Sequence, residues 1–336
     1  MIDHPTGSGR SMGLSFPKLV MFGFATLAAF GMVAKPASQD ELVTLLPAVS
    51  NDSRSATEIR AHFKGRGFDE AARLSNDLIQ SHPDSWEGYF WRGAAAIQQR
   101  AFYVAVRNLR VAERLRPPHN AVAKSLAIAY YLLDQRQLFE RKMKEALALD
   151  PGDFSPHYYL GRHYLSSTGF EVSVAAQSFV RALEKKPDDA ASTCFYGVAL
   201  EAMGEFDQAR QQFLRAVELA GEQSLITGLA YQGLSRLSLA SDGPAALDFA
   251  RKAIKADPKS AEAQLLLAKS AAAAGDRNQQ LAALHAAAAL ARNEARPQYQ
   301  LVLLYRQMGD EAAARSAVAG YQRSVSCFGN EAPGTK

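Results

Sequence analysis

Apolar positions recur along the chain on two scales. Within a unit, stretches such as "RGFDEAARLSNDLIQSHPD" at residues 66–84 and "GEFDQARQQFLRAVELA" at residues 204–220 have the pattern of an amphipathic helix. Between units, a turn residue returns at intervals of 34 to 37 residues, at Pro83, Pro117, Pro151, Pro187, Gly221 and Pro258. A nearly fixed period in this range predicts a stack of similar supersecondary units.

Small residues hold fixed places relative to these turns. Five residues before each turn stand Leu78, Ala112, Ala146, Ala182, Ala216 and Ala253, and seven residues further back stand Ala71, Ala105, Phe139, Ala175, Ala209 and Ala246. Helices approach one another closely only where their side chains are small. The alanines therefore predict that the helix before each turn packs tightly against a neighbour.

The other half of each unit carries a second signature, visible in "WEGYFWRGAAAI" from Trp86 and "FSPHYYLGRHYL" from Phe154. In the first helix of most units, one position is held by a small residue: Gly93, Ala127, Gly161, Gly197 and Ala268. The position three residues further along that helix is held by a larger residue in several units: Tyr130, Tyr164, Leu200, Leu234 and Tyr305. Gly204, Gly275 and Gly309 stand where this first helix must end, which is a common use of glycine. Each unit is thus predicted to be two helices joined by a turn.

With these residues in place, the chain resembles the tetratricopeptide repeat (TPR) family. The resemblance implies an all-α, right-handed superhelical solenoid of about seven to eight helix-turn-helix repeats over residues 52–323. The predicted repeats are 52–85, 86–119, 120–153, 154–189, 190–223, 224–260, 261–294 and 295–323. Tyr231 replaces the usual small residue in its unit, and the polar segment 324–336 is predicted to be a flexible tail.

The first 38 residues differ from the rest. Arg10 and Lys18 precede an uncharged apolar run of 16 residues at 19–34, which is the order of a secretory signal peptide. A permanent membrane span needs roughly 17 to 25 apolar residues, so a cleaved signal is favoured over a retained anchor, and both remain open. Either way, the protein is expected to be exported, periplasmic or extracellular, or to be tethered to a membrane by residues 19–34.

Composition and spacing give no support to catalysis. The formal net charge of +4 divides into 38 basic and 34 acidic residues, which is a mixed surface that does not favour a nucleic-acid partner. His157 and His163 are six residues apart, so they lie on different sides of a helix and cannot share a metal ion. Nucleophile-elbow and phosphate-loop motifs are also missing from the sequence. We expect no enzyme activity, no cofactor and no metal, and Cys194 and Cys327 match no metal motif.

TPR proteins bind peptides and partner proteins on the concave surface lined by the first helix of each repeat, so the resemblance implies a scaffold or adaptor. By the geometry of that family, the inward positions of this chain are held by Phe90, Lys124, Tyr131, Tyr158, Arg162, Glu201, Gln232, Arg236, Lys269, Tyr299 and Arg306. Five of these eleven residues are basic and one is acidic. This balance favours an acidic or carboxylate-ended partner segment, while the alternative is that these are ordinary solvated side chains.

The sequence therefore predicts a non-catalytic protein–protein interaction scaffold that binds a peptide or partner protein in its concave groove. A non-catalytic regulatory subunit of an envelope or secreted enzyme complex is the alternative. Membrane contact is expected only through the N-terminal segment, if that segment is not cleaved.

Overall fold

The computed structural model describes residues 54–116, 118–166 and 171–329, and the predicted signal peptide or anchor at residues 1–38 lies outside them. Within the described residues the chain forms sixteen helices and no strand. The helices are α3 (Arg54–Lys64), α4 (Phe68–Ser81), α5 (Trp86–Gln98), α6 (Phe102–Leu115), α7 (Asn120–Leu132), α8 (Arg136–Leu149), α9 (Ser155–Ser166), α10 (Val172–Lys185), α11 (Ala190–Met203), α12 (Phe206–Ala220), α13 (Leu225–Ser238), α14 (Gly243–Ala256), α15 (Ala261–Ala273), α16 (Arg277–Leu290), α17 (Ala295–Met308) and α18 (Glu311–Gly329).

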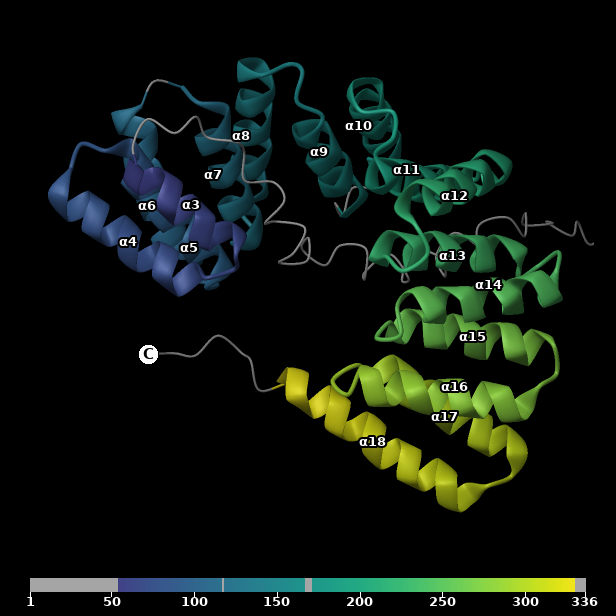
Figure 1. Cartoon of the computed structure of the whole chain (residues 1–336). Coiled ribbons are helices and arrows are strands. Elements are labelled where there is room, and N and C mark those ends of the chain that lie inside the picture. The colour runs from purple at the N-terminus through teal and green to yellow at the C-terminus, as the bar shows by residue number, and fades with distance from the viewer. Residues whose placement is uncertain (1–53, 117, 167–170, 330–336) are drawn as a thin grey trace, which may run out of the picture.

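The helices are arranged in consecutive pairs. Each odd-numbered helix packs most closely on the even-numbered helix that follows it, and successive pairs stack in chain order. Figure 1 shows this most clearly from α13 to α17, which lie as successive layers. Odd-numbered helices also contact one another, as α11 does with α13 and α13 with α15, so they line one side of the stack as the inner helices. The prediction of an all-helical solenoid is confirmed.

Buried phenylalanines on the outer, even-numbered helices pack into places that glycine leaves open. Phe179 and Phe213 are both 0% exposed. A Cβ atom added to Gly161 would lie 2.8 Å from the ring of Phe179, and one added to Gly233 would lie 2.5 Å from the ring of Phe213. Both distances are too short for any side chain, so the ring and the glycine fix how closely the helices approach.

Turn geometry also agrees with the glycine positions. Gly204 and Gly309 end α11 and α17 with φ values of 84° and 75°, a left-handed conformation that glycine adopts without steric cost. Serine and aspartate side chains begin the inner helices: Asp189, Ser224 and Ser260 each accept a hydrogen bond from a backbone amide in the first turn. Caps at both ends therefore set the register in which the inner helices present their side chains.

The last helix is longer than the sequence pattern suggested. Helix α18 continues to Gly329, so residues 324–329 are helical, although they were predicted to belong to a flexible tail. Ser324 is 3% exposed, and its hydroxyl donates to the carbonyls of Arg292 and Gly320. The contact with Arg292 ties the end of α18 to the turn before α17, which a polar composition alone cannot reveal.

A polar network joins α7 to the turn between α8 and α9. Among the described helices, α8 and α9 are the adjacent pair with the sparsest packing. The Lys124 ammonium lies 2.5 Å from the Asp153 carboxylate, and the exposed fractions of the two side chains are 8% and 13%. Asn120 donates to the same carboxylate. Burial raises the pKa of Asp153, but the hydrogen bond and charge of Lys124 outweigh it, so this pKa lies below its usual value.

Two further features bear on the environment of the chain. None of the helices in the described residues is long and apolar enough to cross a membrane. Cys194 is fully buried on α11, and burial raises the pKa of its thiol to about 12. Cys194 therefore acts as a small packing residue on its helix.

Replacing Gly233 by alanine is expected to lower the free energy of unfolding by about 1–2 kcal/mol. Overpacking against Phe213 costs about 1–3 kcal/mol, and the alanine returns up to about 1 kcal/mol of helix propensity. Urea unfolding of the full chain measures the change. Gly243→Ala is the matched control because nothing lies within 4 Å of its added Cβ. Equal unfolding free energies for the two variants would contradict the packing described here.

Replacing Lys124 by methionine should lower the free energy of unfolding at pH 7 by about 3 kcal/mol, because a buried carboxylate loses its partner. Because the folded pKa of Asp153 is depressed, the stabilisation by the pair is present above the unfolded pKa near 4 and is lost as the pH falls through the folded value. The difference between wild type and variant should therefore shrink below about pH 4. Urea titrations at pH 7, 5 and 3, followed by tryptophan fluorescence, test this.

The control for this pair is Lys186→Met, since Lys186 is 45% exposed beside Asp189 and an exposed pair contributes little. A Lys124→Met effect that is as small as the control, or that does not change with pH, would contradict the role assigned to the pair.

Candidate functional site

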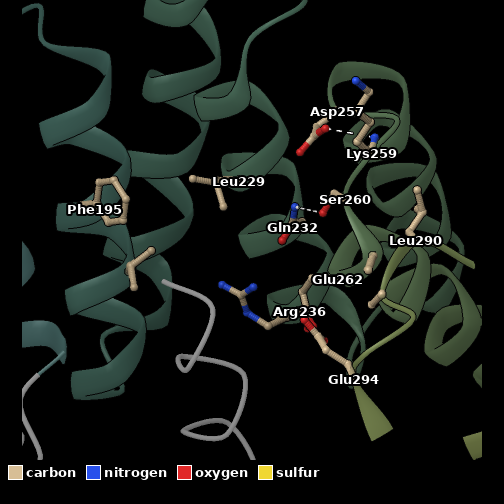
Figure 2. Close-up of a pocket in the computed structure, with 13 residues that line it drawn as sticks. Phe195, Leu229, Gln232, Arg236, Asp257, Lys259, Ser260, Glu262, Leu290 and Glu294 are labelled. Carbon is tan, nitrogen blue, oxygen red and sulfur yellow. Dashed lines mark hydrogen bonds between the residues drawn. The ribbon is translucent and has the colours of Figure 1, made fainter. Parts of the chain in front are cut away.

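The inner helices α11, α13 and α15 line a polar hollow. We call it the Arg236 pocket; its volume is about 280 Å³, and it is closed on one side by the turn that leads into α17. Its lining residues are Phe195, Val198, Leu229, Gln232, Arg236, Asp257, Lys259, Ser260, Ala261, Glu262, Leu290, Ala291 and Glu294. Figure 2 shows Arg236, Glu262 and Glu294 gathered at one end of this pocket and Asp257 and Lys259 at the other.

Arg236 is held by a carboxylate of the neighbouring inner helix. Its Nε and Nη2 atoms donate to the two oxygens of Glu201 at 2.8 and 2.7 Å, which is a bidentate pair between α13 and α11. The side chains of Arg236 and Glu201 are 18% and 5% exposed. Burial lowers the pKa of Arg236, but Glu201 more than offsets it, so the guanidinium stays charged and is neutralised by its partner. The pair links two repeats.

Glu262 faces the same pocket from the first turn of α15. Its side chain is 8% exposed and accepts one hydrogen bond of 2.9 Å from Arg296, which is itself 48% exposed. Burial raises the pKa of Glu262, and the opposing charges of Arg296 and Arg236 do not fully compensate. The carboxylate of Glu262 is thus less well neutralised than that of Glu201.

A polar bridge crosses the middle of the pocket. The Gln232 side-chain amide donates to Ser260 Oγ at 3.2 Å, and the same oxygen accepts from the Ala263 backbone amide at 3.1 Å. Ser260 therefore caps α15 and fixes Gln232 of α13 at once (Figure 2). The bridge holds the floor of the pocket in one arrangement.

A second hollow lies further along the inner side, between α15, α16 and α17. It has a volume of about 210 Å³, and Lys269, Gln300, Leu303 and Gln307 are among its lining residues. Lys269 is exposed, and Leu303 is 41% exposed. We call it the Lys269 pocket. The two pockets lie along one series of inner helices.

The eleven predicted groove residues divide by exposure into three groups. Phe90, Lys124, Tyr158, Glu201 and Gln232 are buried, Tyr131, Arg162 and Arg236 are half-buried, and Lys269, Tyr299 and Arg306 are exposed. The structure brings Glu201, Gln232 and Arg236 together at the Arg236 pocket, and it places Lys269 in the neighbouring one. The others are distributed along the stack.

Three of the predicted positions need correction. Phe90 is 0% exposed and packs on Trp86 and Trp91, so it belongs to the core. Tyr158 is 4% exposed and packs on Phe195. The reason is that both rings are large and apolar, so helix–helix packing takes them in. Lys124 is buried too, because Asp153 holds its ammonium.

Aromatic contacts account for two further positions. Tyr131 lies against Phe139, with ring centroids 5.2 Å apart, so it packs on the outer helix of its own pair. The Arg162 guanidinium lies over the ring of Phe195 at 4.7 Å. Arg162 thus spans from α9 to α11, at the edge of the Arg236 pocket but outside its lining.

Sequence reasoning missed Glu262, Ser260 and Glu294. An acidic residue in the first turn of a helix is normally explained by the helix dipole, and a serine before it by capping. Both explanations hold for Ser260 and Glu262, so their sequence context gave no sign of a pocket. Only the approach of α13 to α15 shows that these two residues also face Gln232 and Arg236.

Among the described residues, no group of three or more histidine, cysteine, aspartate or glutamate side chains could hold a metal ion. Two carboxylates at the Arg236 pocket are engaged in ion pairs, Glu201 with Arg236 and Glu262 with Arg296. The pocket offers charge, hydrogen bonds and an apolar wall.

Comparison with known proteins agrees with the repeat pattern. No protein-family model matches the chain. Tetratricopeptide repeat protein 37 of Xenopus laevis is 24% identical to it over 230 residues, which is 66% of this chain and 14% of that protein. The chain thus spans a small part of the length of this relative.

Solved structures show the likeness in three dimensions. A chain of the APC/C hetero-tetramer Cut9–Hcn1 superposes with a TM-score of 0.63 at 13% identity, covering 91% of this chain and 56% of that one. The C-terminal part of a TPR repeat-containing protein from Cytophaga hutchinsonii gives a TM-score of 0.52 at 16% identity, covering 72% and 97%. PilF of Pseudomonas aeruginosa gives 0.52 at 17% identity, covering 62% and 96%.

The resemblance predicted from the repeated alanines, glycines and turn residues is therefore confirmed. In its helix pairs and its structural likenesses, this chain has the fold of the tetratricopeptide repeat proteins to which it is similar.

Proposed function

We propose that the protein is a non-catalytic scaffold that holds an extended segment of a partner protein along its inner helices. The observation that carries this proposal is the pair of hollows on one side of the stack, the Arg236 pocket and the Lys269 pocket. A solenoid has no single closed cleft, so its use as a binding surface depends on such a continuous inner face. Each hollow is the size of a side chain or two, which suits a peptide segment.

Exposed apolar side chains next to the Lys269 pocket support the proposal. Tyr299 and Leu303 on α17 are 51% and 41% exposed. Tyr299 and Leu303 are four residues apart, so they lie on the same face of α17. An apolar strip beside polar hollows gives a partner segment both contact area and polar anchors.

The known likenesses point in the same direction. The chain with the TM-score of 0.63 comes from a hetero-tetramer, so it binds another protein in that structure. By analogy, we propose that the partners of the present chain are also proteins or peptides. A function in an exported or membrane-tethered assembly is likewise proposed, on the apolar run at residues 19–34.

Photo-crosslinking tests the inner-face proposal. The photoreactive residue p-benzoyl-phenylalanine replaces Tyr299 on inner helix α17 in one variant and Tyr103 on outer helix α6 in the other. Both tyrosines are exposed, at 51% and 78%, and both replacements conserve an aromatic side chain. After irradiation in cells of the source organism, we expect a discrete protein adduct from position 299 and none from 103. Adducts from 103 alone would place binding on the outer face and refute the proposal.

Export is tested with a reporter that is active only outside the cytoplasm. Residues 1–53 are fused to alkaline phosphatase lacking its own signal and expressed in a bacterial host. We expect phosphatase activity from this fusion and its loss when residues 19–34 are deleted. A fusion that stays inactive although the protein accumulates would show that the N-terminal segment does not direct export.

A further inference from the structure

The solvent-facing side of outer helix α6 carries one row of large polar side chains. Tyr103, Arg107, Arg110 and Arg114 follow one another at intervals of three or four residues, so they lie along one side of the helix. All four are exposed, and Tyr103 is 78% exposed. The row therefore presents three guanidinium groups and one aromatic ring to whatever lies outside the stack.

The positive charge of this row is not neutralised within the protein. Among residues 54–116, 118–166 and 171–329, no hydrogen bond or ion pair involves Arg107, Arg110 or Arg114. The one carboxylate of α6, Glu113, pairs instead with Lys142 of α8. That ion pair joins the two outer helices, and it leaves the three arginines without a counter-charge.

The basic row continues onto α8. A shift by the repeat of 34 residues leads from Arg107 to Arg141 and from Arg110 to Lys144. Arg141 is exposed and has no ion pair among the described residues, whereas Lys144 pairs with Glu140. The surface made by these unpaired groups is called the basic outer face, and it consists of Tyr103, Arg107, Arg110, Arg114 and Arg141.

The same row in later repeats has a different charge. Its residues are Ser173, Gln177, Val180 and Glu184 on α10, and Asp207, Gln211, Leu214 and Glu218 on α12, all of them exposed. On α14 the row is mixed, with Asp248, Arg251 and Lys255. Exposure to water alone thus does not require arginine at three successive places of this row, as on α6.

Charge and chemistry favour an anionic lipid surface as the occupant of the basic outer face. Clusters of basic side chains on a helix are attracted to anionic headgroups, and a guanidinium binds a phosphate through two hydrogen bonds. Tyrosine is enriched at the membrane–water interface because its ring is apolar and its hydroxyl is polar. Tyr103, the most exposed large side chain of α6, stands at one end of the row.

The position of the face in the chain agrees with this occupant. Residues 35–53 separate the apolar run at 19–34 from α3, and these 19 residues span at most about 65 Å when fully extended. Helices α6 and α8 lie in the same block of the stack as α3 (Figure 1). An apolar run that stays in a bilayer therefore keeps the basic outer face within reach of lipid headgroups.

We propose that the basic outer face docks on an anionic membrane, with Arg107, Arg110 and Arg114 binding lipid phosphates and Tyr103 entering the headgroup layer. A membrane as the occupant, in place of a nucleic acid, rests on the proposed export or tethering. Because the face belongs to outer helices, the inner helices stay open to a partner protein. The inference thus adds a second binding surface to the proposed scaffold.

Photo-crosslinking to vesicles tests the docking in the full chain. The photoreactive residue p-benzoyl-phenylalanine replaces Tyr103 in one variant and Phe206 in the other. Phe206 is the matched control, because it is an aromatic residue on outer helix α12 and is 58% exposed. Both variants keep residues 19–34, so insertion of that run affects them equally. After irradiation, intact-mass spectrometry detects any phospholipid joined to the protein.

On vesicles of phosphatidylglycerol and phosphatidylcholine, we expect a phospholipid adduct from position 103 and little from position 206. The yield at 103 should fall at least about tenfold on vesicles of phosphatidylcholine alone, since each basic side chain near an anionic surface strengthens binding roughly fivefold. High salt should lower the yield as well, because it screens exposed charges.

A triple variant tests the arginines themselves. Arg107→Gln, Arg110→Gln and Arg114→Gln are combined in the chain that carries the photoreactive residue at position 103. These arginines are exposed and unpaired among the described residues, so the variant should unfold at the same temperature as the parent chain. Its adduct yield on phosphatidylglycerol vesicles should fall at least about tenfold.

The matched control removes the same charge elsewhere. Arg181→Gln, Lys185→Gln and Lys255→Gln change three exposed residues of α10 and α14 that have no ion pair among the described residues. This variant should keep the adduct yield of the parent chain, because its basic outer face is intact. An equal loss in both triple variants would show that only net charge matters and would overturn the proposal.

Equal adduct yields from positions 103 and 206, or a yield at 103 that does not depend on phosphatidylglycerol, would also overturn it. A labelled DNA duplex that binds the parent chain but not the variant lacking Arg107, Arg110 and Arg114, without any lipid adduct, would assign the face to nucleic acid instead. A protein adduct at 103 in cells, without a lipid adduct, would assign it to an acidic protein. The scaffold proposal is tested separately by crosslinking at position 299, which does not require lipid.

Discussion

The close approach of helices at glycine and alanine is the constraint on which the rest of this structure depends. Phe213 packs against Gly233 so tightly that an added Cβ would lie 2.5 Å from its ring. Because Phe213 of α12 packs on Gly197 of α11 and on Gly233 of α13, these two inner helices are brought near enough for Arg236 of α13 to reach Glu201 of α11. Packing in the core thereby sets the geometry of polar groups on the inner face.

Charge compensation within the inner face changes how that face can bind. A list of inward residues counts Lys124 and Arg236 as free cations, but each has a buried carboxylate partner, Asp153 and Glu201. Burying two charges is favourable only when they are paired, so such pairs join neighbouring repeats and contribute little net charge to a ligand. Glu262 is held less completely than these, because it accepts one hydrogen bond from Arg296, which is itself 48% exposed. The charge that the inner face offers to a ligand is therefore the charge that ion pairs within the protein do not neutralise.

The repeats, the helix pairs and several turn positions could be predicted from the sequence because they depend on local spacing. Ala209 and Ala216, for example, mark the packed face of a helix and Gly204 marks a helix end, whatever the tertiary arrangement of these helices. The residues exposed on the inner face were harder to predict, because the position of a residue in a helix indicates which side it faces but not which residue of another helix it contacts. Tyr158 has the right position for a groove and is nevertheless taken into the core by Phe195. Asp153 and Glu262 lie outside the expected inward positions and were found only from contacts between repeats.

The central claim is that a partner protein binds along the inner helices. Amide hydrogen exchange of the full chain, measured with and without the partner identified by crosslinking, tests this claim most directly because it reports on every helix at once. The account predicts slower exchange in the inner helices α11, α13, α15 and α17, with little change in α12, α14 and α16. Protection confined to those outer helices, or to α3 and α4 at the start of the stack, would contradict it.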